Sequence, residues 1–151
     1  MPTSTDGSDR STIDAITDAL HRYTRAIDTK DWALLRDSFT ADCVAQYRTK
    51  VLNGVDAIVA YMQPSHDPID GSLHRLTNIE ISVDPSGTTA SATSYIDALL
   101  VHRLHPDGPT FRAIGTYRDS LRLADRWRLA HRTYQQLWVE GSRTILGETH
   151  R

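Results

Sequence analysis

Apolar residues in the first third of the chain recur at steps of three and four, the spacing of an amphipathic helix. The stripe consists of Ile13, Ile16, Leu20, Tyr23 and Ile27. A helix is therefore expected over about residues 12–27. Ser11 and Asp14 form a capping box at its start, with a shorter acid than the usual glutamate.

Two further helices are expected before the pattern changes. Asp31 is placed to cap a short second helix, and residues 43–49 alternate loosely, as in a short strand. Asn53-Gly54 predicts a turn into a third helix that Pro64 should end. The inner face of that helix would carry Val55, Ile58, Val59 and Met62.

Beyond an irregular segment at 64–72, which we expect to be a mobile loop, the apolar period becomes two. Strands are predicted over 73–83, 88–105, 111–123 and 126–139, separated by the turn signals Asp84-Pro85-Ser86-Gly87, His105-Pro106-Asp107-Gly108-Pro109 and Ala124-Asp125. Helices followed by a strand meander indicate an α+β fold, here a cone-shaped, curved antiparallel or mixed sheet packed on three N-terminal helices. A sheet of this size twists, and Gly115 in mid-strand fits a bend that leaves an internal pocket.

Length and composition bound the possible functions. The 151 residues fit one domain at 11–140, between a disordered tail at 1–10 and a polar tail at 141–151. A net charge of −2 does not favour a nucleic-acid partner. The single Cys43 excludes an internal disulfide and a cysteine zinc site, and fits a reducing compartment. Neither a secretory signal nor a membrane-spanning apolar run is evident, so a cytoplasmic location is expected.

Tyr23 and Asp28, near the end of the first helix, are the first candidates for chemistry. A phenol and a carboxylate five residues apart can both point into the space beneath the helix. The simpler alternative is a core tyrosine with a carboxylate in a turn. Asp31 is expected to cap the second helix and is therefore not a candidate for the site.

Asp97 is a further candidate because it lies in the middle of the longest apolar strand. Burying a carboxylate costs several kcal/mol unless it is paired or hydrogen-bonded. It could pair with Arg112 or Arg118 across the wet face of the sheet. Alternatively, it could lie in the pocket and orient His74, which would then exchange protons through its other ring nitrogen. His74 could also be a plain surface residue.

Other chemistries receive little support from the sequence. His102 and His105 have a helical ligand spacing but lie in a predicted strand, where they would face opposite sides, so no metal site is expected. No phosphate loop, Gly-x-Ser-x-Gly elbow or cysteine–base pair is evident. This pattern favours acid/base chemistry or none.

Several segments together resemble the SnoaL-like members of the nuclear transport factor two-like superfamily. The first are Arg-Tyr-Thr-Arg-Ala-Ile-Asp at 22–28, Asp-Trp at 31–32, Leu-Leu at 34–35, Phe-Thr-Ala-Asp at 39–42 and Gly-Val-Asp-Ala-Ile at 54–58. The later ones are Leu-His-Arg-Leu-Thr-Asn at 73–78, Gly-Thr-Tyr-Arg-Asp at 115–119 and Arg-Trp-Arg-Leu-Ala-His-Arg at 126–132. The resemblance covers about residues 11–139 and implies a cone with one deep, mostly apolar pocket.

Within this superfamily the chain is most similar to the bile-acid dehydratase and scytalone dehydratase branch. That resemblance implies four catalytic positions, at Tyr23, Asp28, His74 and Asp97. It also implies a basic residue from the last strand, either His131 or Arg132. Further substrate contacts are expected from Trp32, Tyr95 and Tyr117.

The sequence therefore predicts a cofactor-independent lyase (a dehydratase) or isomerase acting on a hydrophobic polycyclic, steroid-like or polyketide-like molecule. In this hypothesis His74 removes a proton, Asp97 orients it, Tyr23 stabilises the enolate and Asp28 holds Tyr23 or a substrate hydroxyl. Polyketide cyclisation or epimerisation with Asp97 as base is one alternative. A non-catalytic ligand-binding or assembly subunit is another. A homodimer or homotrimer formed through the convex sheet face is expected in each case.

Overall fold

The computed structural model describes residues 6–147, with side chains from residue 10 onward. The helices are α1 (Asp6–Asp28), α2 (Trp32–Asp37) and α3 (Val55–His66), and a short 3-10 helix, η1, covers Arg143–Ile145. The strands are β1 (Phe39–Tyr47), β2 (Lys50–Asn53), β3 (Gly71–Val83), β4 (Thr89–Val101), β5 (Thr110–Leu123) and β6 (Trp127–Gly141).

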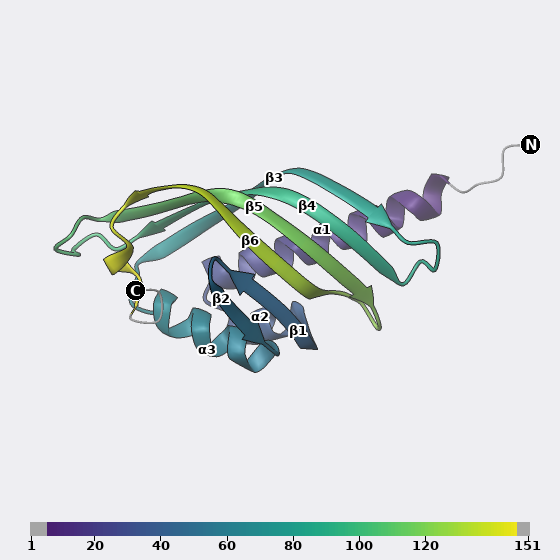
Figure 1. Cartoon of the computed structure of the whole chain (residues 1–151), viewed down its shortest axis with the longest axis horizontal. Coiled ribbons are helices and arrows are strands. Elements are labelled where there is room, and N and C mark those ends of the chain that lie inside the picture. The colour runs from purple at the N-terminus through teal and green to yellow at the C-terminus, as the bar shows by residue number, and fades with distance from the viewer. Residues whose placement is uncertain (1–5, 148–151) are drawn as a thin grey trace, which may run out of the picture.

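All six strands form one mixed sheet in the order β2-β1-β6-β5-β4-β3. β1 runs parallel to β6, and every other neighbouring pair is antiparallel. The sheet arches over the three helices, and α1 runs beneath it (Figure 1). The predicted α+β cone is therefore confirmed, including its curvature and its three helices.

Helix α1 buries four of the five residues of the predicted stripe against the concave face of the sheet, and Ile13 is half-buried. Ile16, Leu20, Tyr23 and Ile27 are each at most 1% exposed. The helix begins at Asp6, ahead of the predicted capping box, so it includes residues 6–10 that were expected in a disordered tail. A helix anchored by a buried stripe can continue into polar residues at little cost. Residues 1–5 of that predicted tail lie outside the described part.

Gly115 lies at an irregularity in the pairing of β5 with β6, between Ile114 and Gly115. A Cβ atom at this position would lie 2.1 Å from the carbonyl oxygen of Gln135 and 2.8 Å from the ring of Tyr134. Only glycine permits this close approach of two backbones, and such irregularities bend a sheet. The predicted role of Gly115 in the curvature agrees with this packing.

The end of α3 differs from its prediction. Pro64 lies inside the helix, which continues to His66. A proline removes one amide donor, and here only the last turn lies beyond it. The segment 64–72, expected as a mobile loop, therefore begins with helical residues that face inward, including Ser65 and His66, both buried.

The C-terminal segment also packs more closely than its polar composition suggested. Ile145 and Leu146 are buried, at 2% and 4% exposure. The amide of Gly147 donates to the carbonyl of Ser65 at the end of α3, with an N···O distance of 3.2 Å. Residues 141–147 thus close one end of the cone, while 148–151 lie outside the described residues.

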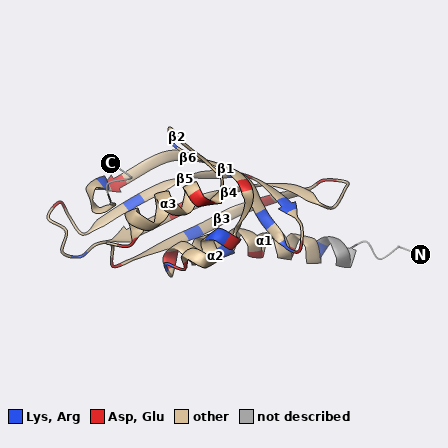
Figure 2. Ribbon diagram, turned by 90° about the horizontal axis from the view of Figure 1, so that it is seen from below, with Lys and Arg blue, Asp and Glu red and all other residues tan. Residues whose placement is uncertain are grey.

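Charged residues of both signs are interspersed over the helices and strands (Figure 2). This distribution agrees with the near-neutral net charge of −2. In the described part of the chain, no helix is long and apolar enough to cross a membrane.

Candidate active site

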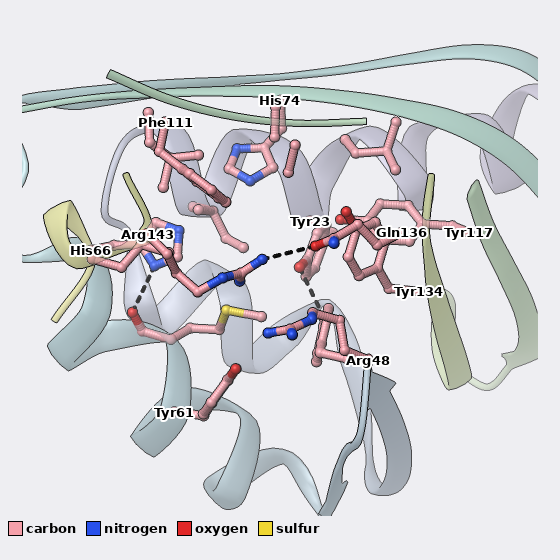
Figure 3. A pocket seen from close by; sticks show the side chains of 18 residues that line it. Tyr23, Arg48, Tyr61, His66, His74, Phe111, Tyr117, Tyr134, Gln136 and Arg143 are labelled. Atoms are coloured by element: carbon pink, nitrogen blue, oxygen red, sulfur yellow. Dashed lines mark hydrogen bonds between the residues drawn. The ribbon is translucent and has the colours of Figure 1, made fainter. Parts of the chain in front are cut away.

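A cavity of about 90 Å³ lies between the concave face of the sheet and helices α1 and α3 (Figure 3). Its walls are mostly apolar and include Ile27, Met62, Ile96, Ala98, Leu100, Phe111, Ala113 and Leu146. The polar side chains at the cavity are Tyr23, Tyr47, Arg48, Tyr61, His66, His74, Tyr117, Tyr134, Gln136 and Arg143. An apolar pocket with a few convergent polar groups is the usual form of a small-molecule site.

Asp28 and His74 form the central polar contact of this cavity. The Asp28 Oδ1 atom accepts from His74 Nδ1 at 2.6 Å and from the Ser72 hydroxyl at 2.8 Å. Its Oδ2 atom accepts from the backbone amide of His74 at 2.8 Å. The carboxylate thus fixes both the backbone and the ring of His74. It selects the tautomer with the proton on Nδ1 and leaves Nε2 as the acceptor.

The charge of Asp28 is maintained by the same contacts. Burial raises the pKa of Asp28, but the hydrogen bonds and charge of His74 and the hydrogen bond from Ser72 outweigh it and hold the pKa below its ordinary value. Asp28 is the last residue of α1, where the helix dipole disfavours a negative charge. The hydrogen bonds from β3 compensate for that position. The site therefore contains a carboxylate beside an imidazole that lines an apolar cavity.

The expected pair of His74 with Asp97 is not formed. In the β3–β4 register His74 lies opposite Ala98, whereas Asp97 lies opposite Arg75. Side chains alternate along a strand, so His74 points into the cone and Asp97 points out. On the outer face Asp97 receives two hydrogen bonds from Arg112, at 2.9 and 2.8 Å. The alternative of an arginine pair on the wet face is therefore correct for Asp97.

Tyr95 shares the outer face with Asp97 and is 55% exposed, so it does not line the cavity as expected. Trp32 is also outside the cavity lining. Its indole N–H donates to Asp67 at 3.1 Å, and its ring lies 6.4 Å from that of His66. Of the aromatic residues expected to contact substrate, Tyr117 is the one that lines the cavity.

Tyr23 lines the cavity. The Asp28 carboxylate, which was expected to hold it, is instead hydrogen-bonded to Ser72 and His74. The Tyr23 hydroxyl lies 2.9 Å from the Tyr47 hydroxyl. Burial raises the pKa of Tyr23 well above its ordinary value, so the phenol stays protonated at neutral pH. Tyr117 also forms a side-chain hydrogen bond with Tyr23. Three neutral phenols joined in this way use two hydrogens among themselves and retain one for a ligand.

Of the two basic residues of β6 that were considered for the pocket, Arg132 faces the interior of the cone. It is fully buried, whereas His131 is exposed. Arg132 donates to both carboxylate oxygens of Asp119, each at 2.8 Å. Its guanidinium carbon lies 4.2 Å from the ring centroid of Tyr23 and 3.8 Å from that of Tyr117. Arg132 therefore lies behind the two tyrosines and holds their rings in place rather than lining the cavity.

The sequence reasoning did not identify His66. Its Nδ1 atom lies 2.9 Å from the Met62 carbonyl oxygen and 2.9 Å from the Ser65 hydroxyl, and its ring centroid lies 6.1 Å from that of His74. Burial, followed by the nearby His74, lowers the pKa of His66 to about 4. The available signal was its place on the apolar stripe, four residues after Met62. Because the helix was predicted to end at Pro64, His66 was assigned to the loop that follows it.

Within the described residues, no group of three or more His, Cys, Asp or Glu side chains is placed to hold a metal ion. The expectation of a reaction without a cofactor stays a prediction.

Comparisons with known proteins agree with this architecture. Residues 9–133 match the profile of the SnoaL-like domain family. The terrestric acid biosynthesis cluster protein E of Penicillium crustosum is 29% identical over 144 residues, covering 89% of each chain.

Solved structures show the same fold. A provisionally assigned scytalone dehydratase from Novosphingobium aromaticivorans superposes with a TM-score of 0.82 at 21% identity, covering 90% of this chain and 91% of that one. A nuclear transport factor 2-like superfamily protein from Salmonella enterica gives a TM-score of 0.73 at 19% identity, covering 86% and 94%. The resemblance to the SnoaL-like family, predicted from sequence motifs, is confirmed by the family match, and these solved structures share the predicted fold.

The lowered pKa of His66 predicts a pH-dependent stability. The pKa of a histidine in the unfolded chain is near 6.5, whereas that of folded His66 is about 4. Between these two pH values, protonation of His66 therefore favours the unfolded chain. The stabilisation that the folded protein gains from neutral His66 is complete above pH 6.5 and decreases as the pH falls toward 4. Between pH 7.5 and 4.5 it amounts to about 2–3 kcal/mol of unfolding free energy.

Chemical denaturation of the wild type and of His66→Gln at the two pH values measures this contribution. The wild type should lose about 2–3 kcal/mol more than the variant. His131→Gln, at an exposed position, is the matched control and should behave as the wild type. Equal losses in all three proteins would contradict the assignment.

Proposed function

Because the chain belongs to the SnoaL-like domain family, we propose that it is an enzyme of cofactor-independent acid/base chemistry, a lyase or isomerase acting on an apolar small molecule. The observation that carries this proposal is the contact of Asp28 with His74 Nδ1 at 2.6 Å, beside an apolar cavity. Fixing one ring nitrogen with a carboxylate prepares the other to accept a proton.

In the proposed reaction, His74 Nε2 removes a proton from a carbon next to a carbonyl group. The electron pair of the C–H bond moves toward the carbonyl oxygen and forms an enolate. The Asp28 carboxylate stabilises the positive charge that develops on the His74 ring. In a dehydration, the β-hydroxyl then leaves and receives the proton from His74, whereas in an isomerisation the proton returns to another carbon.

The hydroxyls of Tyr23 and Tyr47 are suited to stabilise the enolate oxygen. Both phenols line the cavity, and the linked hydroxyls of Tyr117, Tyr23 and Tyr47 have one hydrogen to donate beyond the bonds among them. Stabilisation of a developing oxyanion by fixed donors commonly contributes 10²–10³-fold to a rate. Arg132, through its contacts with the rings of Tyr23 and Tyr117, keeps this donor in position.

The relatives support this class of chemistry. One similar protein belongs to a terrestric acid biosynthesis cluster, and one similar structure is provisionally assigned as a scytalone dehydratase. We therefore propose a polyketide-like or polycyclic substrate, with dehydration or isomerisation as the reaction. Cyclisation or epimerisation would begin with the same proton removal by His74, and loss of water in the product separates dehydration from them.

Self-association through the outer face of the sheet is part of the proposal. Leu73, Tyr95 and Trp138 lie on that face and are 58%, 55% and 61% exposed. Large apolar side chains on one exposed face are typical of an interface. A homodimer or homotrimer would cover them.

Size-exclusion chromatography with light scattering should therefore give the mass of a dimer or trimer. Trp138→Glu should shift the mass toward the monomer, because a charge buried at an interface is unfavourable. Leu104→Glu, in a turn and 94% exposed, is the matched control and should leave the mass unchanged. A monomeric wild type would rule out this assembly.

Proton removal by His74 predicts catalysed hydrogen exchange next to a ketone. In D₂O, 1-tetralone should gain deuterium at its α-carbon in the presence of the wild type, as followed by mass spectrometry. His74→Gln should reduce the enzyme-dependent rate by about 10²–10⁴-fold, the usual contribution of a general base. Asp28→Asn should also reduce it, since the ring loses its orienting carboxylate.

Asp97→Asn is the matched carboxylate control, because Asp97 lies on the outer face and pairs with Arg112. Exchange in this variant should equal that of the wild type. If wild type and His74→Gln exchanged 1-tetralone at the same rate, His74 would not be the base.

A further inference from the structure

Two arginines that are far apart in the sequence reach the cavity on its side away from α1. Arg48 lies in the turn between β1 and β2, and Arg143 is the first residue of η1. Both line the cavity. Figure 3 shows both guanidinium groups extending into the same space, with His74 entering from the opposite wall.

Neither of these guanidinium groups forms an ion pair within the described residues, whereas seven other arginines do. Those arginines pair with aspartates: Arg36, Arg103, Arg112, Arg122, Arg126, Arg128 and Arg132. Arg143 instead donates to the Gln136 side-chain oxygen at 2.9 Å and lies 5.0 Å from the ring centroid of Phe111. Two positive charges thus reach one cavity wall without a carboxylate to balance them.

The electrostatics of Arg143 agree with this description. Burial lowers the pKa of the Arg143 guanidinium, and the positive charge of Arg48 lowers it further. Arg48 is exposed and Arg143 is half-buried. A bound anion would relieve the repulsion between the two charges and compensate the solvation that Arg143 has lost.

Tyr134 adds a third group to the same wall. Its hydroxyl is buried and has no hydrogen-bond partner within the described residues. Burial raises the pKa of Tyr134, and the charges of Arg143 and Arg48 oppose that rise, so the phenol lies within range of both. Buried polar groups nearly always have partners, and a buried hydroxyl without one at a cavity indicates a place for a ligand.

The backbone of Arg48 gives an independent indication. Its φ of 58° is in the left-handed region, which favours glycine or asparagine. Arginine is less favourable for this turn than glycine or asparagine, and its side chain lines the cavity.

From these observations we propose that Arg48, Arg143 and the Tyr134 hydroxyl form a carboxylate-binding subsite within the cavity. A carboxylate would receive N–H donors from the two guanidinium groups and an O–H donor from Tyr134, and would neutralise the excess positive charge. The substrate class is then an apolar molecule that bears a carboxylate at some distance from the carbon on which His74 acts. The assignment to a substrate rests on the proposed function, whereas the binding of a carboxylate does not.

Benzoate and benzamide provide the test, because they share a shape and differ in charge. Their dissociation constants are measured by ligand-observed NMR at low and high NaCl. Benzoate should bind the wild type about tenfold more tightly than benzamide, and added salt should weaken its binding. Arg143→Gln and Arg48→Asn should each remove most of the preference for benzoate.

The variants are chosen to separate binding from folding. Asparagine suits the left-handed backbone at residue 48, so Arg48→Asn removes the guanidinium without straining the turn. Arg118→Gln removes the same charge from the exposed outer face and should keep the full preference. Equal binding of benzoate and benzamide, or a preference that persists in Arg143→Gln and Arg48→Asn, would overturn the subsite.

His74→Gln separates this inference from the proposed function. It should keep the preference for benzoate, because the imidazole is not part of the subsite. A preference lost in His74→Gln but retained in Arg143→Gln would place the carboxylate at His74 and overturn the subsite. Failure of deuterium exchange with 1-tetralone would instead count against the base and not against the binding of benzoate.

Discussion

The hydrogen bonds from β3 to the carboxylate of Asp28 hold the site together. This one side chain binds the ring and the amide of His74 and the hydroxyl of Ser72. It thereby joins the end of α1 to the start of β3, two elements that also pack along much of their length. The same contacts that fix the helix under the sheet fix the orientation of the imidazole. The packing of α1 on β3 and the proposed chemistry therefore share one carboxylate.

A buried ion pair supports the opposite side of the cavity. Arg132 and Asp119 face inward from β6 and β5, where an unpaired charge would cost several kcal/mol. Paired with Asp119, Arg132 provides a flat cation between the rings of Tyr23 and Tyr117. The phenols at the cavity are thus held by packing as well as by hydrogen bonds. The proposed site would thus combine a base, hydrogen-bond donors and two arginines in an otherwise apolar cavity.

Much of the fold could be predicted from the sequence, because helical and strand periods differ and turn residues mark their ends. Asp28, His74 and Tyr23 could be identified as candidates, but the partner of His74 could not. An alternating strand shows which residues share a face, but the register with the next strand decides which face is buried. His74 lies opposite Ala98 and not Asp97, so the carboxylate on the neighbouring strand faces outward. Arg143 and His66 lie in segments that were predicted as a polar tail and a loop, and only tertiary packing brings them to the cavity.

The central claim, that Asp28 prepares His74 as a base, concerns the position of one proton. Long-range ¹⁵N–¹H correlation NMR of the uniformly ¹⁵N-labelled protein reports which nitrogen of a neutral histidine ring carries it. The structure predicts that His74 is protonated on Nδ1, with Nε2 as the unprotonated nitrogen, and that Asp28→Asn weakens this preference. A neutral His74 protonated on Nε2 in the wild type, with a spectrum unchanged in Asp28→Asn, would contradict the account.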